Sequence, residues 1–539
     1  MYRLMIYLVL GLTLSSLVQA QAVDPLVAEL DVLAHSKLSK MPAQIDVLSK
    51  MDDSRVVVVL QALLGGNLYI RKTDKRLFLA YPGDDNTLEL SDPLGELTPT
   101  VAPKKQFKRL AVNNRMRSQL RFAVAEINLQ SADAEQRQAA VLRLLDDLTP
   151  EVLALLNQMA ETESNTQVMD VIYVARGLAA LDSGDRLDRL AAIDLLQGNL
   201  QPIVKNRLQQ LLALDGDGKP LEKDPVVYKK AHTALMGIES TEKFFGFVET
   251  TFFGLSLGSV LLLSAIGLAI TFGVMGVINM AHGELIMLGA YTTYVVQLLM
   301  PNHLEYSLLV AVPAAFLVSG LVGVAIERGV IQFLYGRPLE TLLATFGISL
   351  ILQQLVRSIF SPLNRSVATP EWMSGALQIN PVFALTYNRM YILVFALIVF
   401  VLLLLLLKKT TLGLQFRAVA QNRAMARAMG IRSQWVDAMT FGLGSGVAGI
   451  AGVALSQLTN VGPNLGQAYI IDSFMVVVFG GVGNLWGTLV SAFSLGIANK
   501  FIEPLAGAVL AKIVVLVFII LFIQRNPRGL FPQQGRAAE

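Results

Sequence analysis

Residues 251–273 read TFFGLSLGSVLLLSAIGLAITFG, and this stretch decides the class of fold. No Asp, Glu, Lys or Arg occurs between Glu249 and Glu284, whereas a helix needs only about 20 mostly apolar residues to cross a bilayer. The stretch therefore predicts a membrane-spanning helix. The first charge after it stands in GVINMAHGELIMLGAY, residues 276–291, where Glu284 follows His282 by two positions.

The composition of the whole chain points the same way. Hydrophobic residues make up 53% of the 539 residues and charged residues only 16%, against about a quarter in soluble proteins. The net charge of +3 is too near balance to indicate a nucleic-acid partner, and none is expected. With no cysteine, the chain has no disulfide, thiolate metal site or cysteine nucleophile. No catalytic Ser/His/Asp spacing and no metal site is recognised, so the sequence does not predict an enzyme.

Further apolar runs follow the first one. Candidate spans lie near 282–300, 306–326, 340–360, 390–407, 436–457 and 507–524. The region 470–502 is also apolar, but GGVGNLWG at 480–487 interrupts it and predicts two short crossings joined by a glycine turn. We therefore expect an all-α polytopic membrane protein with about eight or nine transmembrane segments, one pair of them broken by glycines.

The first 240 residues have a different character. Residues 1–20 read as a secretory signal with a basic start, an apolar middle and a small-residue cleavage site at Ala20; an uncleaved anchor is the alternative. Residues 21–240 carry scattered charges and predict a mainly α, exported, periplasmic domain. Within it, 67–81 predicts a hairpin with Thr73-Asp74 in the turn. Segments 134–148 and 184–200 predict HEAT-like helical repeats or a plain helical bundle.

The distribution of positive charge predicts the orientation in the membrane. The loop at 408–434 holds six Lys and Arg residues and no acid, which favours the cytoplasmic side. Arg328, Arg337, Arg525 and Arg528 also fall at predicted cytoplasmic ends. Counting spans back from the loop places residue 250 outside, in agreement with an exported N-terminal domain. Counting forward places the C-terminus in the cytoplasm.

The same loop has an ordered, helix-forming composition. Residues 410–433 read TTLGLQFRAVAQNRAMARAMGIRS, with Gly430 as a helix stop signal. A basic loop of this kind lies on anionic lipid, docks in a cleft on a cytosolic partner, or is simply solvated. The alanine-rich pattern favours docking.

At this loop the chain resembles a known family. Ala426 and Gly430 resemble the coupling loop of ATP-binding-cassette importer permeases. The fuller resemblance is to the branched-chain amino-acid permease family of LivH type and covers residues 250–531. Its motifs, in order, are GLAITFGVMGVINMAHGELIMLGAY (267–291), TLLATFGISLILQ (341–353), TTLGLQFRAVAQNRAMARAMGI (410–431), FGLGSGVAGIAGV (441–453) and FGGVGNLWGTLVSAFSLG (479–496). Within the family, LYGRPLETLLATFGISLILQQ (334–354) and NVGPNLGQAYIIDSFMVVVFGG (460–481) resemble the urea permease subgroup of Urt type.

The resemblance implies a multi-subunit importer in the bacterial inner membrane. A second permease subunit, cytosolic ATP-binding-cassette subunits and a periplasmic substrate-binding protein are the implied partners. No GxxxxGK[ST] phosphate loop occurs in the chain, so the implied ATP is used by partner subunits and no cofactor is bound directly. Coupling to the ATPase is expected at residues of the loop, namely Arg417, Arg423, Ala426, Arg427 and Gly430.

The substrate path is expected to use polar groups inside the membrane segments, since such groups are functional by default. The candidates are Asn279, His282, Glu284, Asp472 and Asn484. Three alternatives stay open: Glu284 as a charge that stabilises a helix N-terminus, Glu284 as a contact with the ATPase or the partner permease, and Asp472 as an N-terminal cap for 473–480. The glycines of FGLGSGVAGIAGV favour close helix packing over a substrate site.

The sequence therefore predicts the permease subunit of an ATP-driven urea importer. Alternatives are a permease for branched-chain amino acids or short amides, a passive urea or solute channel, and a membrane sensor that binds a ligand through its exported domain. Urea is small, neutral and polar, so its path needs donors and acceptors instead of a fixed charge.

Overall fold

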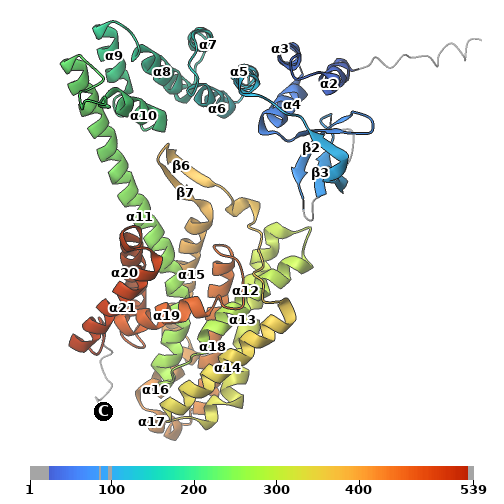
Figure 1. The fold of residues 1–539 in the computed structure, drawn as a ribbon. Helices are drawn as coiled ribbons and strands as arrows, with labels where there is room; N and C mark the ends of the chain where they lie inside the picture. Colours follow the sequence, from blue (N-terminus) through green and yellow to red (C-terminus); the bar gives the residue numbers. More distant parts are fainter. Residues whose placement is uncertain (1–23, 52, 84–86, 95–99, 532–539) are drawn as a thin grey trace, which may run out of the picture. The chain divides into compact units, whose positions relative to one another are not determined.

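A computed structural model describes residues 24–51, 53–83, 87–94 and 100–531 (Figure 1). The chain forms two compact units, Met1–Glu239 and Ser240–Glu539, which we call unit 1 and unit 2. The predicted signal segment 1–20 lies outside the described residues. The boundary of the units falls inside one long helix, α11 (Pro225–Met275).

Unit 1 begins with three helices and a small sheet. The helices are α2 (Pro25–His35), α3 (Met41–Ser49) and α4 (Ser54–Gly65). The strands are β1 (Leu68–Arg71), β2 (Leu77–Pro82), β3 (Thr87–Ser91), β4 (Thr100–Pro103) and β5 (Phe107–Arg109), with the 3-10 turn η1 (Lys104–Gln106) before β5. They form an antiparallel sheet in the order β4-β3-β2-β1-β5. Leu33, Ile45 and Leu60 of the helices and Leu68 of β1 form one buried core.

The predicted hairpin at 67–81 is confirmed, because β1 and β2 pair antiparallel with Leu68 opposite Leu79 and Ile70 opposite Leu77. Thr73 and Asp74 lie in the connection. The rest of the sheet was not predicted. Strand β5 joins β1 with Tyr69 opposite Arg109, a pairing that no local pattern announces.

Six more helices follow in unit 1, and the first five of them have a side-chain cap at the N-terminus. The six helices are α5 (Asn114–Leu129), α6 (Ala134–Leu144), α7 (Pro150–Ala160), α8 (Thr166–Ala180), α9 (Arg186–Leu196) and α10 (Pro202–Leu211). The side chains of Asp133, Asn165 and Asp185 accept hydrogen bonds from the first-turn N–H groups of α6, α8 and α9. The segments 134–148 and 184–200 are helical as expected, and their aliphatic faces enter one shared core. Their assignment as HEAT-like repeats stays a prediction.

Unit 2 is a bundle of long apolar helices. After α11 come α12 (His282–Leu299), α13 (Leu304–Gly329), α14 (Pro338–Phe360), α15 (Tyr387–Lys409), α16 (Thr411–Gln421), α17 (Arg423–Ala428), α18 (Ser433–Ser456), α19 (Gln467–Gly480), α20 (Leu485–Ala506) and α21 (Ala508–Arg525), with two 3-10 turns, η2 (Ile331–Phe333) and η3 (Glu371–Met373). In the described residues, seven helices are long and apolar enough to cross a membrane: α11, α13 with η2, α14, α15, α18, α20 and α21. The polytopic all-α prediction is confirmed.

The predicted glycine break is confirmed, but the prediction of two short segments is only half right, because α20 has 22 residues. Helices α19 and α20 are separate, and residues 481–484 lie between them, with Gly481 and Gly483 at positive φ. Helix α19 has 14 residues, fewer than a full bilayer crossing requires. A second hairpin, β6 (Ala376–Asn380) with β7 (Phe383–Thr386), lies between α14 and α15 and was not predicted.

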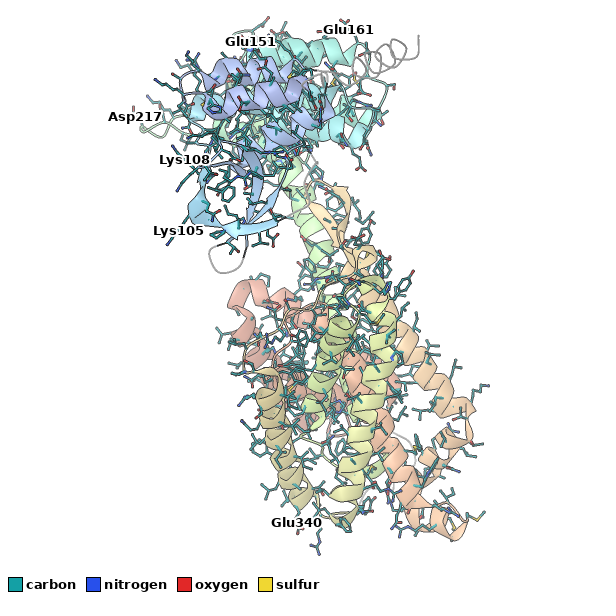
Figure 2. All side chains as sticks on the ribbon, turned by 90° about the vertical axis from the view of Figure 1, so that its right-hand side faces the viewer. Lys105, Lys108, Glu151, Glu161, Asp217 and Glu340 are labelled. Atoms are coloured by element: carbon teal, nitrogen blue, oxygen red, sulfur yellow. The ribbon has the colours of Figure 1, made fainter. Side chains whose placement is uncertain are left out.

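Helices α12, α13 and α18 lie side by side at the centre of unit 2 (Figure 1). A Cβ atom on Gly289 of α12 would lie only 2.0 Å from the carbonyl oxygen of Gly449 of α18. Small residues let helix backbones approach this closely. The interpretation of FGLGSGVAGIAGV as a packing face is therefore confirmed, and this packing holds the first turn of α12 in place. At one end of the bundle, the exposed first turn of α14 carries Glu340 (Figure 2).

Candidate functional site

The strongest candidate site is a row of buried polar side chains between α12 and α14. On α14, Thr341, Thr345, Ser349 and Gln353 recur at every fourth position and are all buried. Residues four apart share one face of a helix, so these side chains form a single stripe. This stripe and the polar groups that face it from α12 are called the polar seam below.

Glu284 is the centre of the polar seam. It lies in the first turn of α12 and is only 1% exposed. Its Oε1 accepts hydrogen bonds from Ser349 Oγ at 2.9 Å and Gln353 Nε2 at 2.7 Å. Its Oε2 is buried and has no hydrogen-bond partner among the described residues. The carboxyl therefore lies at a helix terminus and also presents a free acceptor to the seam.

Asn279 lies at one end of the seam, in the turn before α12. Its Oδ1 accepts from the N–H of Ala281 at 3.0 Å, and its buried Nδ2 has no partner in the described residues. The next residue is tied to α14, because Met280 N–H donates to Thr345 Oγ1 at 3.1 Å.

Tyr291 continues the seam two helical turns beyond Glu284. Its ring lies 4.8 Å from that of Phe360 on α14, and its buried hydroxyl also has no partner in the described part of the chain. Sequence analysis missed this residue and the stripe on α14. The signal was present as polar residues four apart in TLLATFGISLILQ.

The other predicted path residues have different surroundings. His282 is fully buried and donates from Nε2 to the carbonyl of Ser264 on α11 at 2.7 Å, so it joins α12 to α11. Asn484 caps α20: its Oδ1 accepts from Trp486 and Gly487 N–H, and its Nδ2 donates to the carbonyl of Phe531. The contacts of these two side chains in the described residues do not reach α14.

The expected cap role of Asp472 is wrong. Helix α19 begins at Gln467, so Asp472 lies inside the helix, where no backbone N–H is free for capping. Its carboxyl instead forms an ion pair with Lys512 of α21 at 3.0 Å. Asp472 therefore ties two helices together.

The second candidate site is the basic loop, residues 408–434, which folds into α16 and α17. Arg423 donates to both carboxylate oxygens of Asp437 on α18, at 2.7 and 2.6 Å. Its guanidinium carbon lies 3.9 Å from the centre of the Tyr335 ring. Such a bidentate, stacked arginine fixes geometry more strongly than a lysine does. Arg423 therefore holds the loop against the bundle.

The other predicted coupling residues help to fix the conformation of the basic loop. Arg427 Nε donates to Ser433 Oγ at 2.8 Å, Ala426 is buried, and Arg417 donates to the carbonyl of Leu407. Gly430 has a φ of +86°, and Ile431 N–H bonds the carbonyl of Ala426, as in a Schellman ending. The predicted helix stop at Gly430 is confirmed.

Two apolar side chains of the loop were missed by the sequence analysis. Met425 of α17 and Met429, the residue that follows this helix, are 62% and 78% exposed. Flexible methionines suit adaptable protein contacts. They are better candidates for a docking surface than Arg423, which already has partners.

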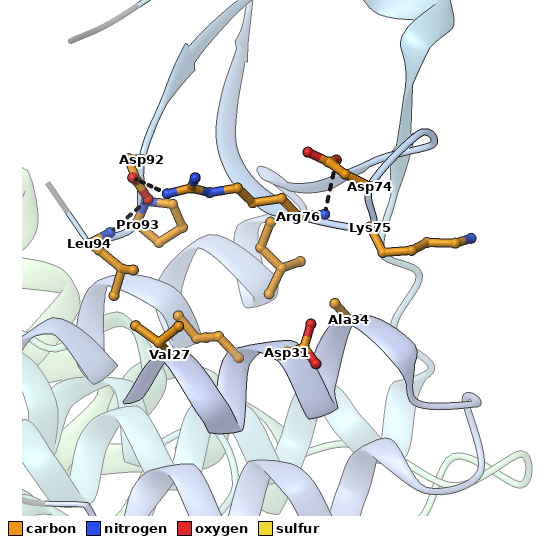
Figure 3. A pocket seen from close by; sticks show the side chains of 11 residues that line it. Val27, Asp31, Ala34, Asp74, Lys75, Arg76, Asp92, Pro93 and Leu94 are labelled. Carbon is orange, nitrogen blue, oxygen red and sulfur yellow. Dashed lines mark hydrogen bonds and ion pairs between the residues drawn. The ribbon is translucent and has the colours of Figure 1, made fainter. Parts of the chain in front are cut away.

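Unit 1 contains a pocket of about 480 Å³ between α2 and the sheet (Figure 3). Arg76 reaches across it to the buried carboxylate of Asp92 at 2.9 Å, and Asp92 also accepts from Leu94 N–H. Asp74 accepts from Arg71 and from Arg76 N–H. Because these polar groups hydrogen-bond to one another, fewer of them are available to bind a small ligand than in the polar seam. In the described residues, no group of three or more His, Asp or Glu could hold a metal ion.

Comparison with known proteins agrees with the features of unit 2. The family described as "branched-chain amino acid transport system / permease component" matches residues 250–523. The high-affinity branched-chain amino acid transport system permease protein BraD of Pseudomonas aeruginosa is 29% identical over 286 residues, which are 51% of this chain and 93% of BraD. LivH of Escherichia coli is 29% identical over 301 residues, 54% of this chain and 97% of LivH.

A more distant relative is the ribose import permease protein RbsC of Bacillus subtilis, 31% identical over 129 residues, 23% of this chain and 40% of RbsC. No solved structure matches the chain significantly. These relatives are permease components of transport systems and not enzymes. The polytopic bundle and the match over residues 250–523 together show that the chain belongs to the permease-component family of branched-chain amino acid transport systems.

Proposed function

We propose that this chain is the membrane-spanning permease subunit of an ATP-driven importer and that it passes urea along the polar seam. The observation that carries the proposal is the set of unpartnered polar atoms in the seam. Asn279 Nδ2, Glu284 Oε2 and the Tyr291 hydroxyl are all buried and without partners among the described residues. A buried polar atom without a hydrogen bond is costly, so a site that retains several is prepared for a polar ligand.

The chemistry of the seam suits a small amide. Urea presents N–H donors and one carbonyl acceptor, and it has neither charge nor hydrocarbon. Glu284 Oε2 can accept from its N–H groups, and Asn279 Nδ2 can donate to its carbonyl. Ser349 Oγ and Thr345 Oγ1 already donate their hydrogens, to Glu284 and to the carbonyl of Leu342, so they add acceptors to the path. A neutral solute can thus exchange hydration for hydrogen bonds along this path.

The basic loop is the proposed contact with the ATPase. Its exposed Met425 and Met429 offer a docking surface, while the Arg423–Asp437 pair transmits its position to α18. The chain lacks a phosphate loop of its own, so ATP binding falls to cytosolic partner subunits. A second permease subunit and a periplasmic binding protein complete the proposed importer.

The proposed topology follows from charge. The basic loop and the C-terminus lie in the cytoplasm and unit 1 lies in the periplasm, with unit 2 in the inner membrane. In this arrangement Glu284 and Asn279 lie at the cytoplasmic end of α12. Unit 1 is then on the side of the membrane where the binding protein delivers the solute.

A branched-chain amino acid is the second candidate substrate, and two observations favour it. The relatives BraD and LivH are named as branched-chain amino acid permeases. In addition, Arg357 lies one turn beyond Gln353 on α14, so the seam contains an acid and a base that a zwitterion would use. Against this, Arg357 already donates to Asn464 Oδ1 at 2.8 Å, which leaves Glu284 as the seam's free ionisable group.

The experiment that tests the ATP-driven class uses proteoliposomes containing this chain and its partner subunits. Uptake of labelled urea should require ATP inside the vesicles, where it reaches the cytoplasmic face of the importer. It should stop when the ATPase subunits carry a hydrolysis-defective substitution. Uptake that continues unchanged without ATP would identify a passive channel and refute the proposal.

A further inference from the structure

An apolar cavity with a positively charged rim lies beside the basic loop. Its volume is about 270 Å³, and it is formed where the ends of α11 and α15 meet α16 and the turn before α20. Ala269 and Ile270 of α11, Leu404 and Leu407 of α15, and Phe416 of α16 line it. Small-molecule pockets begin at about 300 Å³, so this cavity fits part of one hydrocarbon chain better than a whole solute.

The rim of the cavity carries positive charge that the chain does not neutralise. Lys408 and Arg417 line the cavity, and no acidic residue does. Arg417 donates to the carbonyl of Leu407, which holds its guanidinium at the rim. Lys408 is exposed and has no ion-pair partner within the described residues. The rim therefore favours an anionic occupant.

Trp486 indicates how deep in the membrane the cavity lies. It stands at the start of α20, is half exposed, and meets the Phe400 ring edge-on at 5.5 Å. Tryptophan, lysine and arginine concentrate where hydrocarbon gives way to headgroups. The three rim residues thus mark the interfacial layer, and the apolar floor faces the acyl-chain region beneath it.

We propose that this cavity binds an anionic phospholipid, with its phosphate between Lys408 and Arg417 and one acyl chain along the floor formed by α11 and α15. A soluble phosphate would use the cations and leave the apolar floor empty. An apolar side chain of a partner subunit would fill the floor and leave Lys408 without a counter-ion. Only an amphiphilic anion uses both parts.

The position of the site gives it a consequence for transport. Phe416 and Arg417 belong to α16, the first helix of the basic loop, so a bound lipid packs that helix against the end of α15. This inference concerns a lipid ligand and stands even if the transported solute is not urea.

Trp486 is a built-in probe for the test. The full-length chain with Trp372→Phe and Trp435→Phe retains only this tryptophan. It is placed in phosphatidylcholine nanodiscs that contain either brominated phosphatidylglycerol or brominated phosphatidylcholine at the same mole fraction, and quenching of Trp486 is measured. Two cations near the headgroup predict a preference for phosphatidylglycerol of about thirtyfold.

The variants separate a specific site from general attraction. Lys408→Gln combined with Arg417→Gln should remove the preference. Lys409→Gln is the matched control, because Lys409 is the next residue and does not line the cavity. Equal quenching by the two lipids in the parent chain would overturn the proposal. So would complete reversal of the quenching by soluble glycerol phosphate, which would identify a site for anions alone.

If the single-tryptophan chain does not fold, native mass spectrometry of the chain with all its tryptophans tests the same lipid site. The site is supported if the parent chain and Lys409→Gln retain phosphatidylglycerol and the Lys408/Arg417 double variant loses it. Retention that is equal in all three chains refutes it.

Discussion

Gln353 of α14 donates a hydrogen bond of 2.7 Å to the buried carboxyl of Glu284 at the start of α12. With the second bond from Ser349, this contact joins two helices of unit 2 through one oxygen, and the other oxygen has no hydrogen-bond partner among the described residues. A purely structural carboxyl would be expected to have both oxygens satisfied. The hydrogen bonds give Glu284 a structural role, and the transport role proposed above would use its second oxygen.

Replacing Glu284 with Gln tests this dual role. The amide oxygen can still accept from Ser349 and Gln353, so the protein should insert and assemble normally. An NH2 group replaces Oε2, the oxygen that has no partner, and this group donates instead of accepting. The change removes a hydrogen bond to the solute of about 1.4 kcal/mol and lowers uptake about tenfold. Uptake and assembly in proteoliposomes are compared with Glu340→Gln on the exposed turn of α14 as control. A poorly assembled protein whose folded fraction transports normally would instead assign Glu284 to the helix terminus alone.

The pair of Arg423 and Asp437 should stabilise the basic loop and couple it to transport. Both side chains are mostly buried, at 17% and 6% exposure, so losing one partner leaves the other charge poorly solvated. Arg423→Gln, Asp437→Asn and the double variant form a cycle with an expected coupling energy of about 1–3 kcal/mol. The measurement is thermal stability together with solute transported per ATP hydrolysed. Arg432→Gln, in the same loop and exposed, is the control. Additive effects on both readouts would show that the pair does not act as a unit.

Gly430 should be needed for its backbone conformation and not for space. A Cβ atom there meets nothing within 4 Å, but its φ of +86° lies in the left-handed region. Gly430→Val should therefore cost about 1–2 kcal/mol locally and uncouple ATP hydrolysis from uptake, with membrane insertion intact. Gly430→Asn should be much milder, because Asn tolerates this conformation. Normal coupling in the valine variant would contradict this account of the loop.

Close packing at Gly289 should be essential for assembly of the bundle. Gly289→Ala places a methyl group 2.0 Å from the Gly449 carbonyl oxygen, so α12 and α18 must separate. We expect a sharp loss of monodisperse protein on size-exclusion chromatography. Gly347→Ala on α14 is the matched control, since a Cβ atom there meets nothing within 4 Å. Equal yields of the two variants would show that the helices can move apart at little cost.

Unit 1 should weaken in acid through Glu163. Arg137 donates to both of its oxygens at 2.7 and 3.0 Å and holds the pKa of Glu163 below its usual range. A carboxyl with a lowered folded-state pKa stabilises the fold above its unfolded pKa of about 4.3, and this stability is lost as the pH falls through the folded value.

Hydrogen exchange of α6 and α8 in the full-length chain, corrected for intrinsic exchange, measures the effect of Glu163 between pH 7 and about pH 3, a range that extends below the unfolded pKa. Glu163→Gln should be less protected at pH 7 and less sensitive to acid than the parent. The exposed neighbour Glu161, in the variant Glu161→Gln, is the control (Figure 2). Identical acid sensitivity of parent and Glu163→Gln would assign the acid response to other carboxyls.

The sequence was most informative where one local pattern decides the structure. Glycines at 480–487 predicted the break between α19 and α20, and the hairpin at 67–81 followed from its alternating strands and turn. It was least informative for pairings between distant residues. Strand β5 has three residues and reaches β1 from about forty positions away, so no short window contains both partners.

The site was only partly predictable for a related reason. Glu284 and Asn279 stood out as polar residues in an apolar region, and the structure places both at the seam. The facing residues Ser349 and Gln353 are common in membrane helices, and only the packing of α14 on α12 gives them a role. The alternative cap role of Asp472 failed because α19 begins at Gln467, five residues before it, and its role in the path stays a prediction.

The most direct test of the account is the choice of solute by the reconstituted importer. Proteoliposomes containing this chain, its partner permease, the ATPase subunits and the binding protein are supplied with ATP and with labelled urea or labelled leucine at equal concentration. The account predicts ATP-dependent uptake of urea that clearly exceeds that of leucine and falls in Glu284→Gln. ATP-dependent uptake of leucine without urea would contradict it and assign the seam to a branched-chain amino acid.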